Sequence, residues 1–114
     1  MNIITWNCRG VGSKGFPRLV KDLCGPYHSN ILCLLETRIS GTKATNIARK
    51  FGFSSWHLVE GVGFSGGIWV LWNDTFWCIE VLESHRQFVY LRIAYQNELP
   101  WFLTIVYGSP NIAP

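Results

Sequence analysis

The sequence lacks the patterns of a structural zinc site, of a membrane segment and of a secretion signal. The four cysteines are Cys8, Cys24, Cys33 and Cys78. They form no C-x-x-C pair, and the histidines share no metal-ligand spacing with them or with one another. The uncharged stretch between Glu60 and Asp74 has 13 residues, fewer than the about 20 that a membrane helix needs. The sequence therefore predicts an intracellular protein, nuclear or cytoplasmic, that is not secreted, has reduced cysteines and has no membrane partner.

Acidic residues are scarce, and the basic residues gather in the first half of the chain. Residues 1–50 carry eight basic and two acidic residues, a net charge of +6, whereas residues 51–114 carry two basic and five acidic residues, a net charge of −3. A basic excess of this kind is typical of chains that bind a polyanion such as nucleic acid. A solvated basic helix face would have the same composition, so both interpretations stay open.

Apolar residues make up 48% of the 114 residues, which is enough for one small domain, residues 1–114, with a hydrophobic core. Alternating and short apolar runs predict seven strands, and apolar residues at helical spacing predict two helices. The predicted strands are 2–7, 31–36, 55–60, 66–73, 76–83, 87–95 and 101–107, and the predicted helices are 17–24 and 42–51. Pro17 suits a first helical turn, Thr42 is positioned to cap the second helix, and Asn73-Asp74 is typical of a hairpin turn. We expect an α/β fold, an α+β layered sandwich with helices on one face of a mostly antiparallel sheet.

Polar residues follow the first two predicted strands at the point where each strand ends. Asn7 ends the first apolar run and Glu36 ends the second. In open α/β sheets, ligands bind beyond the carboxyl ends of the strands. The sequence therefore predicts that Asn7 and Glu36 contribute to one shared site.

The glycine-rich segment 10–15 raises a different possibility. Its G-x-G-x-x-G pattern follows a strand and precedes a helix, as in dinucleotide-binding domains, and Glu36 lies 21 residues beyond Gly15, where an acid would bind a ribose. However, residues 7–9 separate the strand from the glycines, and Pro17 starts the helix after the third glycine rather than inside the pattern. A run of strands also follows in place of further strand–helix–strand units. A dinucleotide-binding module stays as an alternative.

Four short segments occur together in an order that points to a family. They are residues 5–10 (TWNCRG), 34–38 (LLETR), 64–72 (FSGGIWVLW) and 106–111 (VYGSPN). In combination they resemble the N-terminal half of the endonuclease/exonuclease/phosphatase superfamily, which includes apurinic endonucleases and deoxyribonuclease-I-like enzymes. The likeness is greatest to the endonuclease domain of plant LINE-type (non-LTR) retrotransposon proteins. The resemblance implies the fold of that half-domain and a Mg²⁺-dependent phosphodiesterase that acts on DNA.

The resemblance also implies roles for individual residues. Glu36 would be the carboxylate that binds Mg²⁺ or Mn²⁺, and Asn7 would order the metal shell or a phosphate oxygen beside it. Tyr107 would hydrogen-bond the scissile phosphate as the third catalytic residue. A single glutamate can suffice, because Mg²⁺ is commonly held by one or two carboxylates, waters and substrate phosphates. The expected contacts to DNA, nonspecific and mainly through phosphates, are Arg9, Lys14, Arg38 and Asn111.

Structural explanations exist for the same residues. Asn7 is also placed to hydrogen-bond the turn after its strand. Tyr107 is also explained as an ordinary strand aromatic. An acid that ends a buried strand needs a partner, and Arg38 is the nearest candidate for Glu36.

The acid, asparagine and histidine residues that the family carries in its second half have no counterparts here. The two aspartates, Asp22 in a predicted helix and Asp74 in a predicted turn, are not placed to act as a general base. We therefore expect a fragment that binds the metal weakly and is catalytically inactive alone. The alternative is a non-catalytic module that binds nucleic acid or associates with itself through an uncovered sheet.

Overall fold

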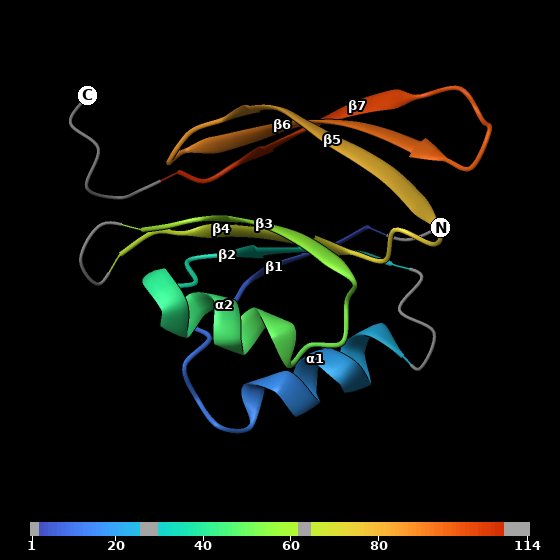
Figure 1. Cartoon of the computed structure of the whole chain (residues 1–114). Helices are drawn as coiled ribbons and strands as arrows, with labels where there is room; N and C mark the ends of the chain where they lie inside the picture. The colour runs from blue at the N-terminus through green and yellow to red at the C-terminus, as the bar shows by residue number, and fades with distance from the viewer. Residues whose placement is uncertain (1–2, 26–29, 62–64, 109–114) are drawn as a thin grey trace.

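Two helices and two sheets stack in three layers in the computed structural model of the chain (Figure 1). The structure describes residues 3–25, 30–61 and 65–108. The strands are β1 (Ile3–Asn7), β2 (Ile31–Leu35), β3 (Ser55–Val59), β4 (Ile68–Trp72), β5 (Trp77–Ser84), β6 (Phe88–Tyr95) and β7 (Trp101–Val106), and the helices are α1 (Phe16–Cys24) and α2 (Gly41–Arg49). Each element lies within two residues of its predicted range, because the apolar periodicity is strong throughout the chain.

The first sheet is mixed and has the strand order β1-β2-β4-β3. β1 and β2 are parallel and are joined through α1, whereas β4 runs antiparallel to both β2 and β3. The two central strands, β2 and β4, are near-continuous apolar runs because both of their faces are covered. Asn7, the last residue of β1, and Glu36, the residue after β2, therefore lie side by side at one end of the sheet.

Both helices cover the same face of the first sheet (Figure 1). Phe16, Val20 and Cys24 recur every four residues and form the buried face of α1. Phe51 follows α2, and its ring lies between those of Phe16, at 5.7 Å, and Trp69 of β4, at 6.0 Å. None of the helices that the structure describes is long and apolar enough to cross a membrane.

The predicted cap of the second helix is wrong. α2 begins at Gly41, before Thr42, and no side chain of the capping residue bonds to its first turn. Instead, the carboxylate of Glu60 accepts a hydrogen bond of 2.6 Å from the Gly41 N–H. An anion is favourable there because a helix N-terminus carries free N–H groups and a partial positive charge.

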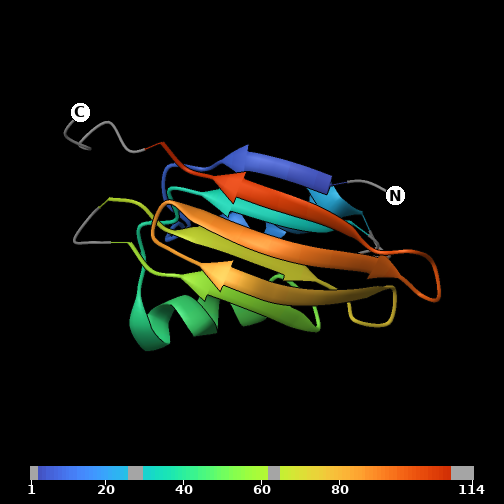
Figure 2. The same cartoon turned by 90° about the horizontal axis from the view of Figure 1, so that it is seen from above.

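The second sheet is an antiparallel meander with the order β5-β6-β7, and it packs on the face of the first sheet that the helices leave open. Val89, Leu91 and Ile93 of β6 point inward, toward Cys33 of β2 and Val70 of β4. Seen from above, β7 lies on the β1 side of the sandwich and β5 on the β3 side (Figure 2). The outer face of this sheet has no layer over it among the described residues.

Two sequence predictions about the sheets are wrong. The strands form two sheets rather than one, and the Asn73-Asp74 segment is no hairpin turn but the link that carries the chain from one sheet to the other. β4 already has β2 and β3 on its two edges, so the strand that follows it cannot form a hairpin with it. The Asp74 carboxylate fixes this link by accepting hydrogen bonds from the hydroxyls of Ser54, at 2.9 Å, and Ser55, at 3.1 Å.

Candidate active site at the ends of β1, β2 and β7

Residues 36–38, which follow β2, are hydrogen-bonded on two sides to parts of the chain that are distant in sequence. The Gly10 N–H donates to the Glu36 carbonyl at 2.7 Å. On the other side, the N–H groups of Glu36 and Arg38 donate to the carbonyls of Gly67 and Gly66, each at 2.9 Å. Two other parts of the sequence, one on each side, therefore fix the backbone position of Glu36, and such support on both sides gives a site its precision.

The carboxylate of Glu36 links the two sheets. The Tyr107 hydroxyl, just beyond the end of β7, donates a hydrogen bond of 2.9 Å to Glu36 Oε1. On the other side, Arg38 Nη2 lies 3.7 Å from Glu36 Oε2. The Glu36 side chain is 15% exposed and that of Arg38 is 41% exposed. The carboxylate is therefore largely buried, held by a phenol, and open to solvent on the side where the arginine lies.

The environment of Tyr107 favours the protonated phenol. Burial of the ring raises the pKa of Tyr107 above its usual value of 10, and the hydrogen bond to Glu36 and the negative charge of Glu36 raise it further. The positive charge of Arg38 opposes these effects. Tyr107 is thus a permanent hydrogen-bond donor at neutral pH.

Backbone strain is concentrated at this end of the molecule. Arg9, Glu36 and Arg38 have φ angles of +52°, +59° and +62°, in the left-handed region that residues with a side chain rarely adopt. Gln96 is the fourth such residue in the described ranges. Strain of this kind costs about 1 to 3 kcal/mol per residue and clusters at functional sites, where neighbouring structure imposes it.

Gly67 and Thr37 form a close contact that sequence reasoning did not single out. Gly67 has a φ of +105°, and a Cβ atom at this position would overlap the hydroxyl oxygen of Thr37. Thr37 is fully buried, and its hydroxyl has no hydrogen-bond partner in the part of the chain that the structure describes. The available signal was the Gly66-Gly67 pair directly before a buried strand. The close approach of these two backbones requires glycine at position 67.

Asn7 lies at the end of β1 with an exposed side chain. It is paired in register with Leu35, the residue that precedes Glu36. Within residues 3–25, 30–61 and 65–108 its amide makes no hydrogen bond, so the alternative in which it caps the following turn is not observed. The Asn7 side chain is therefore free to meet a ligand beside Glu36.

Cys8, a second residue that sequence reasoning missed, lies next to this site. Its Sγ is 3.3 Å from the Leu35 carbonyl oxygen, to which the thiol donates. Burial raises the pKa of Cys8, so the group stays a thiol and is a poor ligand for a hard cation. No group of three or more histidine, cysteine or acidic side chains lies together in the described chain. Any Mg²⁺ here would have Glu36 as its one protein carboxylate.

The residues predicted to contact DNA are only partly brought together. Arg9 is exposed directly before the glycine segment, Lys14 is exposed within it, and Arg38 stands beside Glu36. Asn111 falls outside the described residues. Within the glycine segment, Val11 is fully buried and its N–H donates to the Thr37 carbonyl at 3.2 Å.

The same hydrogen bonds argue against a dinucleotide site. The N–H groups of Gly10 and Val11 are used within the protein, so they do not point at a pyrophosphate. α1 begins at Phe16, after the last glycine of the pattern, as the position of Pro17 predicted.

No protein-family model matches the chain, and a search of curated proteins finds no significant relative. The case for a function therefore rests on the residues themselves and on their geometry.

Proposed function

We propose that the chain is part of a Mg²⁺-dependent phosphodiesterase of the retroelement endonuclease type, with DNA as its substrate. One observation carries the proposal: the 2.9 Å hydrogen bond between Tyr107 and Glu36, which are 71 residues apart. The motif resemblance singles out these two residues independently of the structure. A buried tyrosine hydroxyl usually has a hydrogen-bond partner, and here that partner is the carboxylate that the resemblance assigns to the metal.

The donor set around Glu36 fits a hard divalent cation. Tyr107 uses one lone pair of the Glu36 carboxylate, which has about four, and Arg38 at 3.7 Å is too far for a short hydrogen bond. Glu36 and the Asn7 amide oxygen would hold the ion, with water and substrate phosphate as its remaining ligands. When bound, the cation neutralises charge that develops on a phosphate during hydrolysis.

The protein's own groups would orient the phosphodiester. The Tyr107 hydroxyl donates its one proton to the Glu36 carboxylate and so holds that carboxylate in place, and the Arg38 guanidinium offers planar donors suited to phosphate. Arg9 and Lys14 add positive charge along the neighbouring segment. These residues bind and position; none of them is a base poised to take a proton from water.

Replacement of Glu36 by Gln tests this assignment. We expect Glu36→Gln to weaken Mn²⁺ binding more than about tenfold, since loss of outer-shell partners alone costs 10 to 100-fold. The measurement is Mn²⁺ titration followed by water proton relaxation, with Mg²⁺ as competitor. Glu98→Gln, at an exposed turn, is the matched control for the loss of one negative charge. Equal affinity in the parent and in Glu36→Gln would refute the metal site.

A second candidate function, self-association, has a separate observation in its favour. Phe102 and Val106 on the outer face of the second sheet are 54% and 65% exposed. Tyr90 stacks on Phe102 with ring centroids 6.0 Å apart, which extends the apolar surface. Exposed apolar patches and open sheet edges are typical of association sites.

For this surface we expect Phe102→Ser combined with Val106→Ser to abolish association of the parent chain, because the apolar contact is lost while the buried core is untouched. Sedimentation velocity over a range of protein concentrations is the measurement. Leu99→Ser, on the exposed β6–β7 turn, serves as a matched apolar-to-polar control. A parent chain that sediments as a monomer at all concentrations would rule out this function.

A further inference from the structure

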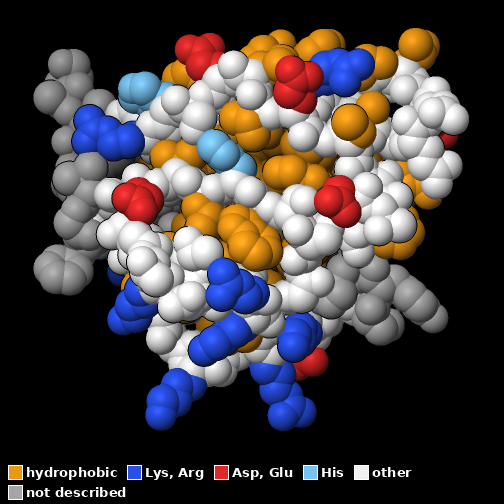
Figure 3. Space-filling view, viewed as in Figure 1, with side chains coloured by type: hydrophobic (Ala, Val, Ile, Leu, Met, Phe, Trp, Pro, Cys, Tyr) orange, Lys and Arg blue, Asp and Glu red, His pale blue; other side chains and the backbone are white. Residues whose placement is uncertain are grey.

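The helical face, away from the Glu36 site, carries a basic groove. Two hollows of about 490 and 690 Å³ lie between α1 and α2 and share Lys14, Pro17 and Lys50, so they form one continuous depression. We call it the interhelix groove. Its basic residues are Lys14, Arg18, Lys21, Lys43, Arg49 and Lys50. Lysine and arginine side chains gather over the two helices in the space-filling view (Figure 3).

The charge in this groove is not balanced by the protein. The ion pair between Glu36 and Arg38 is the one formed by the described residues, so none of the six basic groups has an acidic partner there. α2 contains no acid, and Asp22 is the single acid of α1. Six like charges around one depression repel one another, and a bound polyanion would relieve that repulsion.

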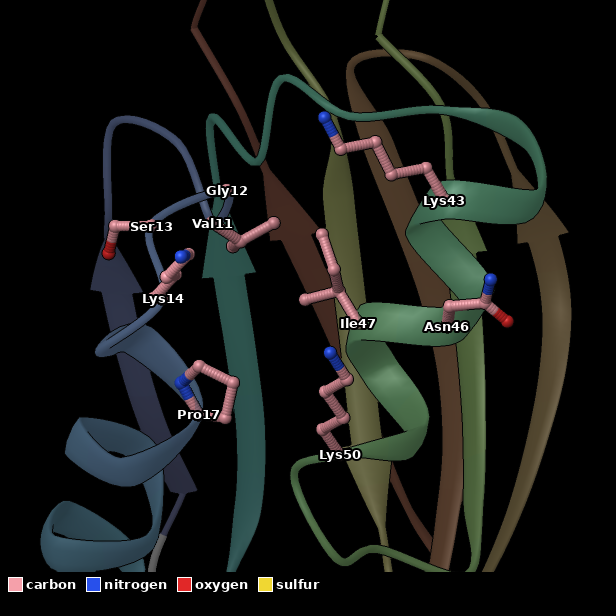
Figure 4. Close-up of a pocket in the computed structure, with 9 residues that line it drawn as sticks. All are labelled: Val11, Gly12, Ser13, Lys14, Pro17, Lys43, Asn46, Ile47 and Lys50. Carbon is pink, nitrogen blue, oxygen red and sulfur yellow. The ribbon is translucent and has the colours of Figure 1, made fainter.

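The arrangement of side chains fits a phosphate backbone. Lys43, Asn46 and Ile47 of α2 and Lys50, the residue that caps its C-terminus, are spaced by three, four and seven residues and line the same hollow. Ile47 faces Val11 across the hollow, with Lys43 and Lys50 on either side of it along the helix (Figure 4). Ammonium, amide and hydroxyl groups around a small apolar floor are the groups that proteins use to hold phosphates.

The residues that line the groove also indicate which kind of nucleic acid it would bind. Among the described residues, no aromatic side chain lines either hollow, so these residues offer bases nothing to stack on. Proteins that bind single strands combine a basic groove with aromatic platforms, whereas contacts to phosphates alone suit a duplex. Six cations along one path also exceed what a single small anion can neutralise.

We propose that the interhelix groove binds the sugar–phosphate backbone of duplex DNA without reading its sequence. This surface is distinct from the Glu36 site and does not need a metal. The two meet at the glycine segment, because Val11 lines the groove and donates to the Thr37 carbonyl beside Glu36. Lys14 lines both hollows from that same segment.

The test is the salt dependence of duplex binding, measured by fluorescence anisotropy in the presence of EDTA. Each lost phosphate contact reduces the slope of log K against log salt by about 0.9. We therefore expect Lys43→Gln combined with Lys50→Gln to reduce the slope by about 1.8. The matched control is Arg86→Gln combined with Arg92→Gln, which removes the same charge from the second sheet and its turn. This control should leave the slope unchanged.

Several outcomes would overturn the proposal. Equal reductions in both double variants would mean that net charge alone drives binding, and an unchanged slope in the α2 variant would mean that the groove is not used. Tighter binding of a single strand than of the duplex would also contradict it. Because EDTA removes divalent metal, a failure of the Glu36 metal site leaves this result unaffected. Thermal melting of both variants checks that the replacements, at three exposed residues and the half-buried Arg92, preserve the fold.

Discussion

Supercoiled plasmid should stay intact when it is incubated with this chain and Mg²⁺. Hydrolysis needs a positioned base for water and stabilisation of the charge that develops on phosphorus, besides a metal. The described residues near Glu36 supply a phenol, an amide and a guanidinium but no second carboxylate or histidine. The absence of a general base costs about 10² to 10⁴ in rate, and the absence of one electrostatic donor costs about 10² to 10³.

The plasmid experiment includes the Glu36→Ala variant, which distinguishes activity of the chain from a contaminating nuclease. Nicking that is equal in the parent and the variant would come from a contaminant. Nicking by the parent that the variant loses would contradict the prediction and show that the groups described here suffice for hydrolysis. An abasic plasmid should be run in parallel, because the superfamily that the motifs resemble includes apurinic endonucleases.

Gly67→Ala should destabilise the fold severely and displace the backbone that holds Glu36 in place. The new methyl group would overlap the Thr37 hydroxyl, and the φ of +105° is strained for any residue with a side chain. Backbone strain of about 1 to 3 kcal/mol and overpacking of a similar size give an expected loss of about 2 to 5 kcal/mol in the free energy of unfolding. The carbonyl of Gly67 holds the Glu36 N–H, so Mn²⁺ binding should fall as well.

Urea unfolding followed by tryptophan fluorescence measures this loss of stability. Gly15→Ala is the matched control, since no atom lies within 4 Å of a Cβ placed there and its φ is −82°. That variant should change the free energy of unfolding by less than about 1 kcal/mol. Similar stabilities for the two variants would mean that the contact between Gly67 and Thr37 does not constrain the site.

The elements were predictable from the sequence, but their assembly was not. Apolar periodicity is a local signal, and it placed both helices and all seven described strands within two residues. The Asn73-Asp74 link was misinterpreted because a turn signal does not tell whether the next strand stays in the same sheet. The cap of α2 was misassigned because Glu60 lies 19 residues from Gly41, beyond any local capping pattern.

The candidate site was predictable in part. The strand-end rule brought Asn7 and Glu36 to one end of the sheet, and the motif resemblance alone added Tyr107 to them. Backbone strain at Arg9 and Arg38 could not be foreseen, because neither residue type favours a positive φ. The interhelix groove was also hidden, since the basic excess of residues 1–50 does not reveal which side chains share a face.

Amide NMR with substoichiometric Mn²⁺ tests the central claim, that Glu36 is the centre of a divalent-metal site next to Tyr107. The paramagnetic ion broadens signals of nearby nuclei first. We predict that the amide signals of Cys8, Glu36 and Tyr107 disappear at the lowest Mn²⁺ concentrations and return when Mg²⁺ is added in excess. Broadening that begins around Asp74 or Glu98, or that is uniform over the exposed acids, would contradict the assignment.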